Sequence, residues 1–158
     1  LAGAMRDPET TSTALTAAEP GHLVFATLHP QDTAQTIDRI LDVFPAHQQG
    51  QVRVQLSVAL QGIMTQQLLP TADGSGRCVA TEILVPNPAV RNLIREGKTH
   101  QIPGMMQVGK RKGNLPLDDA ILDHLKAARI SPEEAYEKST DKKKFRMQLK
   151  TPPKDLEV

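Results

Sequence analysis

The sequence predicts an α/β fold in which parallel strands come first, a hairpin follows and a helical tail ends the chain. The first observation is an apolar run over 22–28, rich in strand formers and followed by a helical pattern, which is typical of a buried parallel strand. The second is a pair of strand-like runs separated by the turn-forming residues 72–76. The third is the helical spacing of Leu117, Ile121 and Leu125. Together these patterns place the parallel sheet before the hairpin and the helices after it.

The front of the chain has the pattern of a strand end followed by a helix. Residues 1–3 have the composition of the end of a buried strand and no initiating Met precedes them, so we expect the chain to be part of a longer polypeptide. Asp7 and Pro8 then predict a helix start, with Asp7 as the N-cap and Pro8 at the first helical position. This helix ends at Pro20, shortly before the strand over 22–28 begins.

A second helix is predicted to begin at Asp32, because Gln35 three residues later completes a capping-box pair. Its apolar stripe has the spacing of one helix face and consists of Ile37, Ile40, Leu41 and Phe44. Pro45 ends this helix. A third helix starts near Gln48, and the apolar residues along one of its sides are Val52, Leu56, Ala59 and Ile63.

The two strands of the predicted hairpin cover 66–69 and 77–85. A short helix over 88–96 follows, with a proline in its first turn. The stretch 97–114 is basic and rich in glycine, so it predicts irregular structure.

The last part of the chain has a helical pattern over 117–128, and Ser131 predicts the cap of a further helix. From Asp141 onward, the composition of lysine, proline and acidic residues predicts a loosely ordered end.

Composition limits the possible partners and compartments. A formal net charge of +1 argues against a nucleic-acid partner. The single cysteine, Cys78, excludes an internal disulfide and fits a reducing compartment. The longest apolar runs, such as 23–28, are far too short to span a bilayer, so we expect no direct membrane insertion. These features predict a cytoplasmic protein.

His29 is the first candidate for chemistry, because it ends the strand over 22–28 at the edge where ligands of α/β sheets bind. An imidazole nitrogen can donate a hydrogen bond to a phosphate oxygen. The alternative is a strand-end histidine that only bonds to a neighbouring loop. His22 is separated from His29 by an odd interval, so on a strand the two side chains point to opposite faces. We therefore predict no metal site in this chain.

Two further motifs are better explained by local structure than by chemistry. Asp7 follows a strand in the way that acidic residues of nucleotide hydrolases do, but we interpret it as a helix cap. The sequence 97–99 matches the Gly-Lys-Thr end of a phosphate-binding loop, but Asn92 stands where its first glycine belongs and no strand precedes it. The sequence therefore contains no nucleotide-binding loop.

The segment from Gly3 to Pro45 closely resembles the part of type IV pilus retraction ATPases (PilT-like, of the type II/IV secretion ATPase superfamily) that spans the Walker B and histidine-box motifs. The stretch 89–96 is similar to the family's C-terminal motif associated with productive retraction rather than with hydrolysis itself. The resemblance fades after about Ser139. It implies a partial RecA-like P-loop NTPase core without the P-loop, followed by a helical C-terminal tail. The implied divisions are part of a RecA-like domain, a helical subdomain and a loosely ordered tail, over 1–114, 115–140 and 141–158.

The resemblance also implies roles for single residues, matched by position. His29 matches the histidine near the terminal phosphate and is the catalytic candidate, while His22 matches the earlier histidine of the same box. Gly3 and Arg6 fall in the Walker B neighbourhood and are further nucleotide-binding candidates. Ala4 stands where the family has a glutamate that coordinates magnesium or activates water. The retraction-motif candidates are Ala89, Val90, Arg91, Asn92, Leu93, Ile94, Arg95 and Glu96.

In the intact family member, the resemblance implies ATP and Mg²⁺ as cofactors. The implied partners are further copies in a homo-hexamer and the pilus platform protein of the inner membrane, at whose cytoplasmic face the ring would lie. The methyl group of Ala4 cannot activate water, and loss of a general base lowers the rate by roughly two to four powers of ten. We therefore expect the isolated chain to be inactive, and poorly stable because a parallel sheet without its inner strands exposes apolar edges.

Two alternatives stay open. One is a catalytically inactive ring or assembly subunit of a pilus or type II secretion machine, which Ala4 favours. The other is a pilus extension or secretion ATPase, which the motif over 89–96 disfavours.

Overall fold

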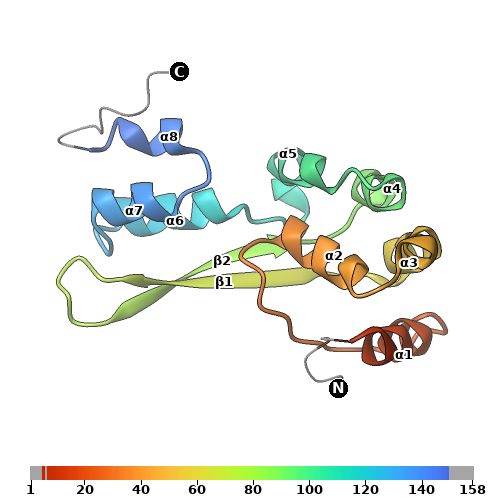
Figure 1. The fold of residues 1–158 in the computed structure, drawn as a ribbon. Helices are drawn as coiled ribbons and strands as arrows, with labels where there is room; N and C mark the ends of the chain where they lie inside the picture. The colour runs from red at the N-terminus through yellow and green to blue at the C-terminus, as the bar shows by residue number, and fades with distance from the viewer. Residues whose placement is uncertain (1–4, 6, 150–158) are drawn as a thin grey trace.

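The computed structural model describes residue 5 and residues 7–149 of the chain. A long two-stranded hairpin runs through the middle of the molecule (Figure 1). Helices of the front half surround its open end, and the C-terminal helices lie over the end that carries the turn. The described elements are α1 (Pro8–Ala18), α2 (Thr33–Asp42), α3 (Ala46–Ala59), β1 (Ile63–Pro70), β2 (Arg77–Leu84), α4 (Pro88–Glu96), η1 (Thr99–Gln101), α5 (Ile102–Val108), η2 (Lys110–Lys112), α6 (Leu117–Lys126), α7 (Pro132–Lys138) and α8 (Lys142–Arg146). None of the helices formed by these residues is both long and apolar enough to cross a bilayer.

Several helices begin where a side-chain oxygen accepts one of the first free N–H groups of the helix. Asp7 accepts a hydrogen bond from the Thr10 N–H at 2.8 Å. Asp32 accepts one from the Gln35 N–H at 2.7 Å, and the Gln35 amide donates back to the same carboxylate. Asn87 and Ser131 cap α4 and α7 in the same way. The predicted caps at Asp7, Asp32 and Ser131 are therefore confirmed.

A first hydrophobic cluster forms around the stripe of α2. All four residues predicted for this stripe are buried, namely Ile37, Ile40, Leu41 and Phe44. The other buried members come from α1, α3, α4, α5 and the end of β2: Leu15, Val52, Leu56, Leu84, Val90, Ile94, Ile102 and Met106. Burial of apolar area drives this packing, at about 25 cal/mol per Å².

The hairpin pairs β1 with β2 in antiparallel register, with Leu69 opposite Cys78. Its inner face is covered, because Leu69, Ala80 and Leu84 are each 0% exposed. Its outer face carries exposed apolar side chains, which are Met64, Leu68 and Val79. Ile63 was expected on the third helix but begins β1, since α3 ends at Ala59.

A second hydrophobic cluster lies under the C-terminal helices and shares the inner face of the hairpin. Leu84 belongs to the first cluster, whereas Leu69 and Ala80 belong to the second. The remaining buried members of the second cluster are Leu117, Ile121, Ile130, Ala135 and Phe145. The same two strands thus support both halves of the structure. The predicted division into 1–114, 115–140 and 141–158 stays a prediction.

The segment 22–28, predicted as a central parallel strand, is extended but does not form a regular strand. A single bridge forms at Thr27, whose carbonyl accepts a hydrogen bond from the Met5 N–H at 3.4 Å. Leu23 and Phe25 are 73% and 62% exposed. A central parallel strand needs a neighbour on each edge, and among the described residues only Met5 provides a backbone bond to this segment. The mixed α/β class and the predicted hairpin are confirmed, whereas among the described residues the segment 22–28 contributes only the bridge at Thr27 and no regular parallel strand.

The stretch 97–114, predicted to be irregular, contains η1, α5 and η2. Ile102 and Met106 of α5 are buried in the first cluster, one helical turn apart. Gly109, which follows α5, lies so close to the buried side chain of Asn114 that a Cβ atom there would collide with the Asn114 amide nitrogen. The prediction was wrong because glycine and proline in this stretch obscure a short buried helix.

The predicted loose end is wrong over 142–146, where α8 forms. Phe145 is fully buried in the second cluster. Asp141 caps the helix by accepting a hydrogen bond from the Lys144 N–H at 3.2 Å. One buried aromatic ring therefore fixes a segment whose composition is otherwise that of a solvated tail.

Candidate functional site

His29 lies in the loop between the extended segment and α2, and its side chain is exposed. Among the residues that the structure describes, none forms a hydrogen bond or ion pair with the His29 imidazole. No described residue therefore occupies either ring nitrogen.

The backbone on both sides of His29 is held in place. Leu28 packs against the first hydrophobic cluster. Asp32 caps α2, and the Thr33 N–H donates to the Glu82 carboxylate at 2.8 Å. The Thr33 hydroxyl also donates to the sulfur of Met106 at 3.4 Å. The loop thus presents, on an anchored backbone, an exposed imidazole that has no partner among the described residues, and an anchored backbone is what a binding site requires.

His22 stands at the other end of the extended segment and is also exposed. Its Nδ1 lies 3.1 Å from the Ala17 carbonyl at the end of α1. A carbonyl only accepts, so this contact needs a proton on Nδ1 and leaves Nε2 as an acceptor in the neutral ring. No hydrogen bond joins His22 to His29 among the described residues.

Three of the predicted site residues, Gly3, Ala4 and Arg6, lie outside the described residues. Asp7, directly after them, is the helix cap that the sequence predicts. Hydrogen bonds from the backbone and then the side chain of Thr10 hold the pKa of Asp7 below its usual value.

The retraction-motif residues form α4 almost completely, and the inner side of this helix belongs to the fold. Val90 and Ile94 are 0% exposed in the first cluster, and Leu93 packs against it. Arg91 donates from one nitrogen, Nη1, to the carbonyls of Ser57 and Val58 at 2.6 and 3.0 Å. These carbonyls belong to the last turn of α3, where free acceptors and the helix dipole favour a cation.

The outer side of α4 is polar. The Asn92 amide donates to Glu96 at 2.6 Å, and Arg95 donates to the Asn92 carbonyl oxygen at 3.2 Å. Lys98 forms an ion pair with Glu96 at 2.8 Å. The hydrogen bond from Lys98, followed by that from Asn92, lowers the pKa of Glu96. Ala89, Asn92, Arg95 and Glu96 are all exposed, so they are the motif residues that a partner can reach.

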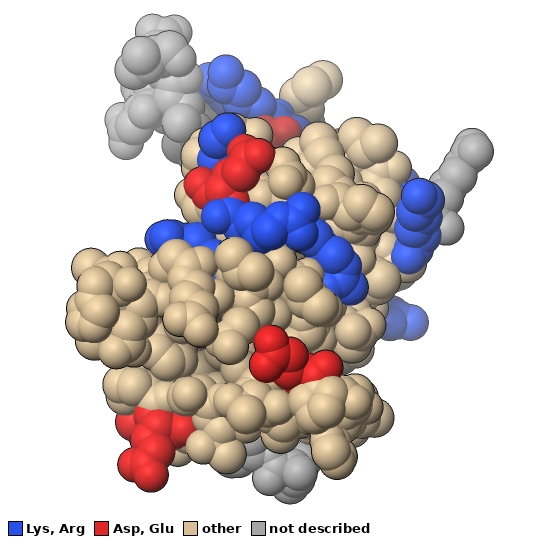
Figure 2. Space-filling view, turned by 90° about the vertical axis from the view of Figure 1, so that its right-hand side faces the viewer, with Lys and Arg blue, Asp and Glu red and all other residues tan. Residues whose placement is uncertain are grey.

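Figure 2 shows Lys and Arg side chains in a band across the face that α3 and α4 present. The basic residues of these two helices are Arg53, Arg91 and Arg95. No carboxylate of a described residue lies within ion-pair distance of their guanidinium groups. These three arginines are therefore not neutralised by a direct ion pair with a described residue, although Glu96 on α4 is also exposed.

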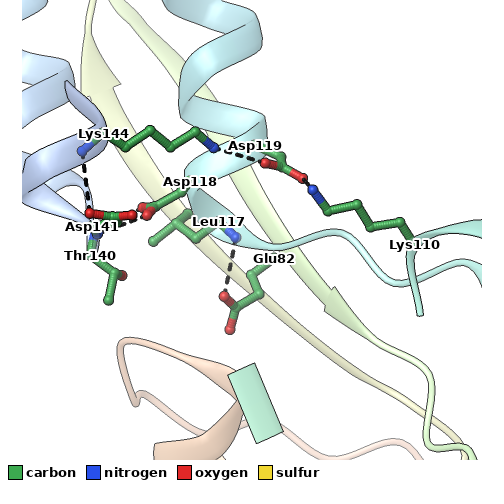
Figure 3. A network of polar contacts seen from close by, with 8 residues as sticks. All are labelled: Glu82, Lys110, Leu117, Asp118, Asp119, Thr140, Asp141 and Lys144. Carbon is green, nitrogen blue, oxygen red and sulfur yellow. Dashed lines mark hydrogen bonds and ion pairs between the residues drawn. The ribbon is translucent and has the colours of Figure 1, made fainter. Parts of the chain in front are cut away.

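A second polar network, which the sequence did not reveal, surrounds the first turn of α6 (Figure 3). Asp118 accepts hydrogen bonds from the Thr140 and Asp141 N–H groups at 2.7 and 2.8 Å. Asp119 forms ion pairs with Lys110 and Lys144. Burial of the Asp119 carboxyl would raise its pKa, but hydrogen bonds from the two lysines outweigh this effect and lower it. The sequence signal that could have indicated this network is the pair Asp118 and Asp119 directly after Leu117, since Asp is favoured in a first helical turn.

Glu82 links this network to the His29 loop. Its carboxylate accepts hydrogen bonds from the Thr33 N–H at 2.8 Å and from the Leu117 N–H at 3.2 Å. No local pattern predicts this pair of bonds, because each joins residues far apart in the sequence.

Comparison with known proteins places this arrangement in a family. Residues 1–112 match the family model of type II/IV secretion system proteins. A twitching motility protein of Neisseria gonorrhoeae is 51% identical over 135 residues, which are 85% of this chain and 36% of that protein. The type IV pilus retraction ATPase PilT of Pseudomonas aeruginosa is 48% identical over 139 residues, which are 88% of this chain and 40% of that protein. The chain thus spans well under half the length of the relatives it matches.

Solved structures show the same fold. A crystal structure of the pilus retraction motor PilT with bound ADP is 48% identical to this chain and superposes with a TM-score of 0.78, covering 90% of this chain and 39% of that chain. The ATPase DotB of Legionella pneumophila is 27% identical with a TM-score of 0.71, covering 85% and 36%. The α/β fold is therefore that of part of an ATPase domain. The chain belongs to the type II/IV secretion system protein family, and within it is similar to the PilT-like ATPases.

Proposed function

We propose that this chain forms the C-terminal part of a hexameric ATPase that powers type IV pilus retraction. The observation that carries the proposal is the 48% identity over 139 residues to a retraction ATPase. Fold alone does not imply function, but a match over 139 of the 158 residues must extend across the loop of His29 and the motif over 89–96. Because the chain spans only 40% of that relative, ATP turnover and pilin disassembly are assigned to the complete assembly.

In this proposal His29 contacts the terminal phosphate of ATP. Its exposed imidazole, without a partner among the described residues, fits a phosphate oxygen as acceptor. When bound, ATP supplies the phosphoryl group and Mg²⁺ neutralises its charge. No group of three His, Cys, Asp or Glu side chains in the described part of the chain could hold a metal ion. Mg²⁺ would therefore be held by the phosphates and by other residues than these.

The outer side of α4 would contact the retraction machinery. What supports this is the division of the helix: Val90, Arg91 and Ile94 are engaged within the fold, whereas Asn92 and Arg95 face outward. The proposed partners are neighbouring copies in a homo-hexamer and the platform protein of the inner membrane. The ring would then lie at the cytoplasmic face of that membrane.

A catalytically inactive ring or assembly subunit is the second candidate, and Ala4 favours it. An alanine offers neither a ligand for Mg²⁺ nor a base for water. Such a subunit would keep the fold and the surface of α4 without turning over ATP.

A chimera tests both candidates. This chain replaces the matching C-terminal residues of the Pseudomonas aeruginosa retraction ATPase, and ATP turnover is measured in vitro and twitching in a strain that lacks the parental gene. Three versions are compared: the chain as it is, Ala4→Glu, and Ala4→Gln as a control of similar shape without the carboxylate.

The retraction proposal predicts that the Ala4→Glu chimera hydrolyses ATP and restores twitching, and that adding His29→Ala removes most of its turnover. The expected gain from Ala4→Glu is roughly two to four powers of ten in rate, with little gain from Ala4→Gln. If the Ala4→Glu chimera shows this gain and the chimera with the unaltered chain has near-zero ATP turnover, the natural sequence is assigned the inactive role. A folded Ala4→Glu chimera that neither hydrolyses ATP nor restores twitching would overturn the retraction proposal.

A further inference from the structure

Glu82 occupies a junction between the two halves of the molecule. It lies on β2 and is partly buried. Its Oε1 accepts the Thr33 N–H at 2.8 Å, and its Oε2 accepts the Leu117 N–H at 3.2 Å (Figure 3 shows the second bond). Both donors are the first residues of their helices, α2 and α6.

Neither helix satisfies these N–H groups locally. The first N–H groups of a helix have no intrahelical acceptor. In α2, the Asp32 side chain accepts from Gln35, so the Thr33 N–H is left to another acceptor. In α6, the N-cap is Pro116, which provides no side-chain hydrogen bond. A carboxylate suits both positions, because the positive end of each helix dipole points at it.

The two helices serve different parts of the structure. α2 begins directly after the His29 loop and fills the first hydrophobic cluster. α6 belongs to the second cluster, and Asp118 and Asp119 in its first turn hold the start of α8 and the residues around η2. A movement of the start of α6 therefore displaces the attachment points of the C-terminal segments.

We propose that Glu82 is a positioning residue that couples the His29 loop to the C-terminal helices by holding the starts of α2 and α6 on one carboxylate. A displacement of the Thr33 N–H moves the carboxylate and weakens the longer bond to the Leu117 N–H. Coupling of this kind is reciprocal, so loosening of α6 also loosens the start of α2. Only the assignment of a nucleotide to the His29 loop rests on the proposed function.

The coupling is measured by amide hydrogen exchange on the chain itself. Asp32→Ala removes the cap of α2, and exchange is followed at the amides of Ile121 and Leu122 in α6. In the parent background we expect Asp32→Ala to speed this exchange by about fivefold or more, since residues in one hydrogen-bond network are coupled by amounts of this order. In the Glu82→Gln background, whose amide oxygen can accept only one of the two N–H groups well, the same change has less than about twofold effect.

Asp118→Asn is the matched control. Asp118 also accepts two backbone N–H groups, but both come from the C-terminal segment. In the Asp118→Asn background, Asp32→Ala should still speed amide exchange at Ile121 as it does in the parent. Where Glu82→Gln does not fold, Glu82→Asp replaces it, because the shorter side chain keeps the charge but cannot span both helices. If Asp32→Ala speeds exchange in α6 equally with and without Glu82, or does not speed it in the parent, the proposed coupling is overturned.

A second experiment tests whether a nucleotide bound at the His29 loop acts through this coupling. In the Ala4→Glu chimera, a non-hydrolysable ATP analogue is expected to slow exchange at the start of α6. Glu82→Gln should abolish this slowing when exchange is compared at equal occupancy of the analogue, which is set from the affinity measured for each variant. A chimera that binds no analogue contradicts the proposed function, while the exchange measurements on the chain alone still decide the coupling.

Discussion

Arg91 is predicted to stabilise the fold, whereas Arg95, one helical turn later in the same motif, is not. Arg91 donates to the Ser57 and Val58 carbonyls at the end of α3. With the described residues, Arg95 makes one side-chain hydrogen bond, at 3.2 Å, to Asn92 on the exposed side of α4. The test is to replace each by methionine, which keeps an apolar stem and removes the donors.

The magnitude follows from the surroundings of each bond. A hydrogen bond from a charged group contributes about 1.5–3 kcal/mol. Both bonds of Arg91 come from one nitrogen, and Val58 is 62% exposed whereas Ser57 is fully buried, so we count one full bond to Ser57. Arg91→Met should therefore lower the free energy of unfolding by about 2 kcal/mol. Arg95→Met should change it by less than about 0.5 kcal/mol, as is usual for surface substitutions.

Urea denaturation of the two variants and the parent measures this difference, with an unchanged slope as evidence that the denatured state is the same. Equal midpoints for the two variants would refute the assignment of Arg91 to the fold. It would also remove the basis for separating an inner and an outer side of the retraction motif.

Three further changes test the packing and the charges. Phe145→Ala should lower the free energy of unfolding by about 3–5 kcal/mol. The control Met147→Ala changes a side chain that is 89% exposed and should alter it by less than about 0.5 kcal/mol. Similar shifts in the melting temperature of both variants would show that Phe145 does not anchor α8. Gly109→Ala adds a methyl group against the buried Asn114 amide and should lower the free energy of unfolding by about 1–3 kcal/mol. Gly104→Ala in α5 meets open space, so it should leave the free energy of unfolding unchanged or raise it by up to about 1 kcal/mol. The pKa of Asp119 is lowered from its ordinary value of 3.8, so its stabilising contribution is complete above that pH and is lost as the pH falls through the folded pKa. The free energy of unfolding should therefore be higher for the parent than for Asp119→Asn at neutral pH. If this difference does not become smaller as the pH is lowered, the reasoning is contradicted.

Local signals in the sequence predicted local structure well. Asp32 and Gln35 form the predicted cap, and the stripe that includes Ile37 and Phe44 is buried, because both patterns depend only on neighbouring residues. The segment 22–28 has the composition of a strand, but a strand also needs pairing partners, and composition does not supply them. α8 was missed for the opposite reason, because Phe145 finds its contacts in residues distant along the chain.

In the candidate site too, features set by neighbouring residues could be predicted, whereas those set by distant residues could not. The position of His29 between an extended segment and a capped helix could be predicted, because strand and cap signals flank it. The two bonds of Glu82 could not, since Thr33 and Leu117 lie far from it in sequence and meet it only through the hairpin. The roles assigned to His29, His22 and the outer residues of α4 remain predictions.

In the described part of the chain the hairpin is a two-stranded ribbon, and its inner side chains are divided between both hydrophobic clusters. Two-stranded ribbons are more strongly twisted than wider sheets. Because Leu84 packs in the first cluster and Leu69 and Ala80 in the second, a slip in the pairing of β1 with β2 would misplace side chains in both interiors at once.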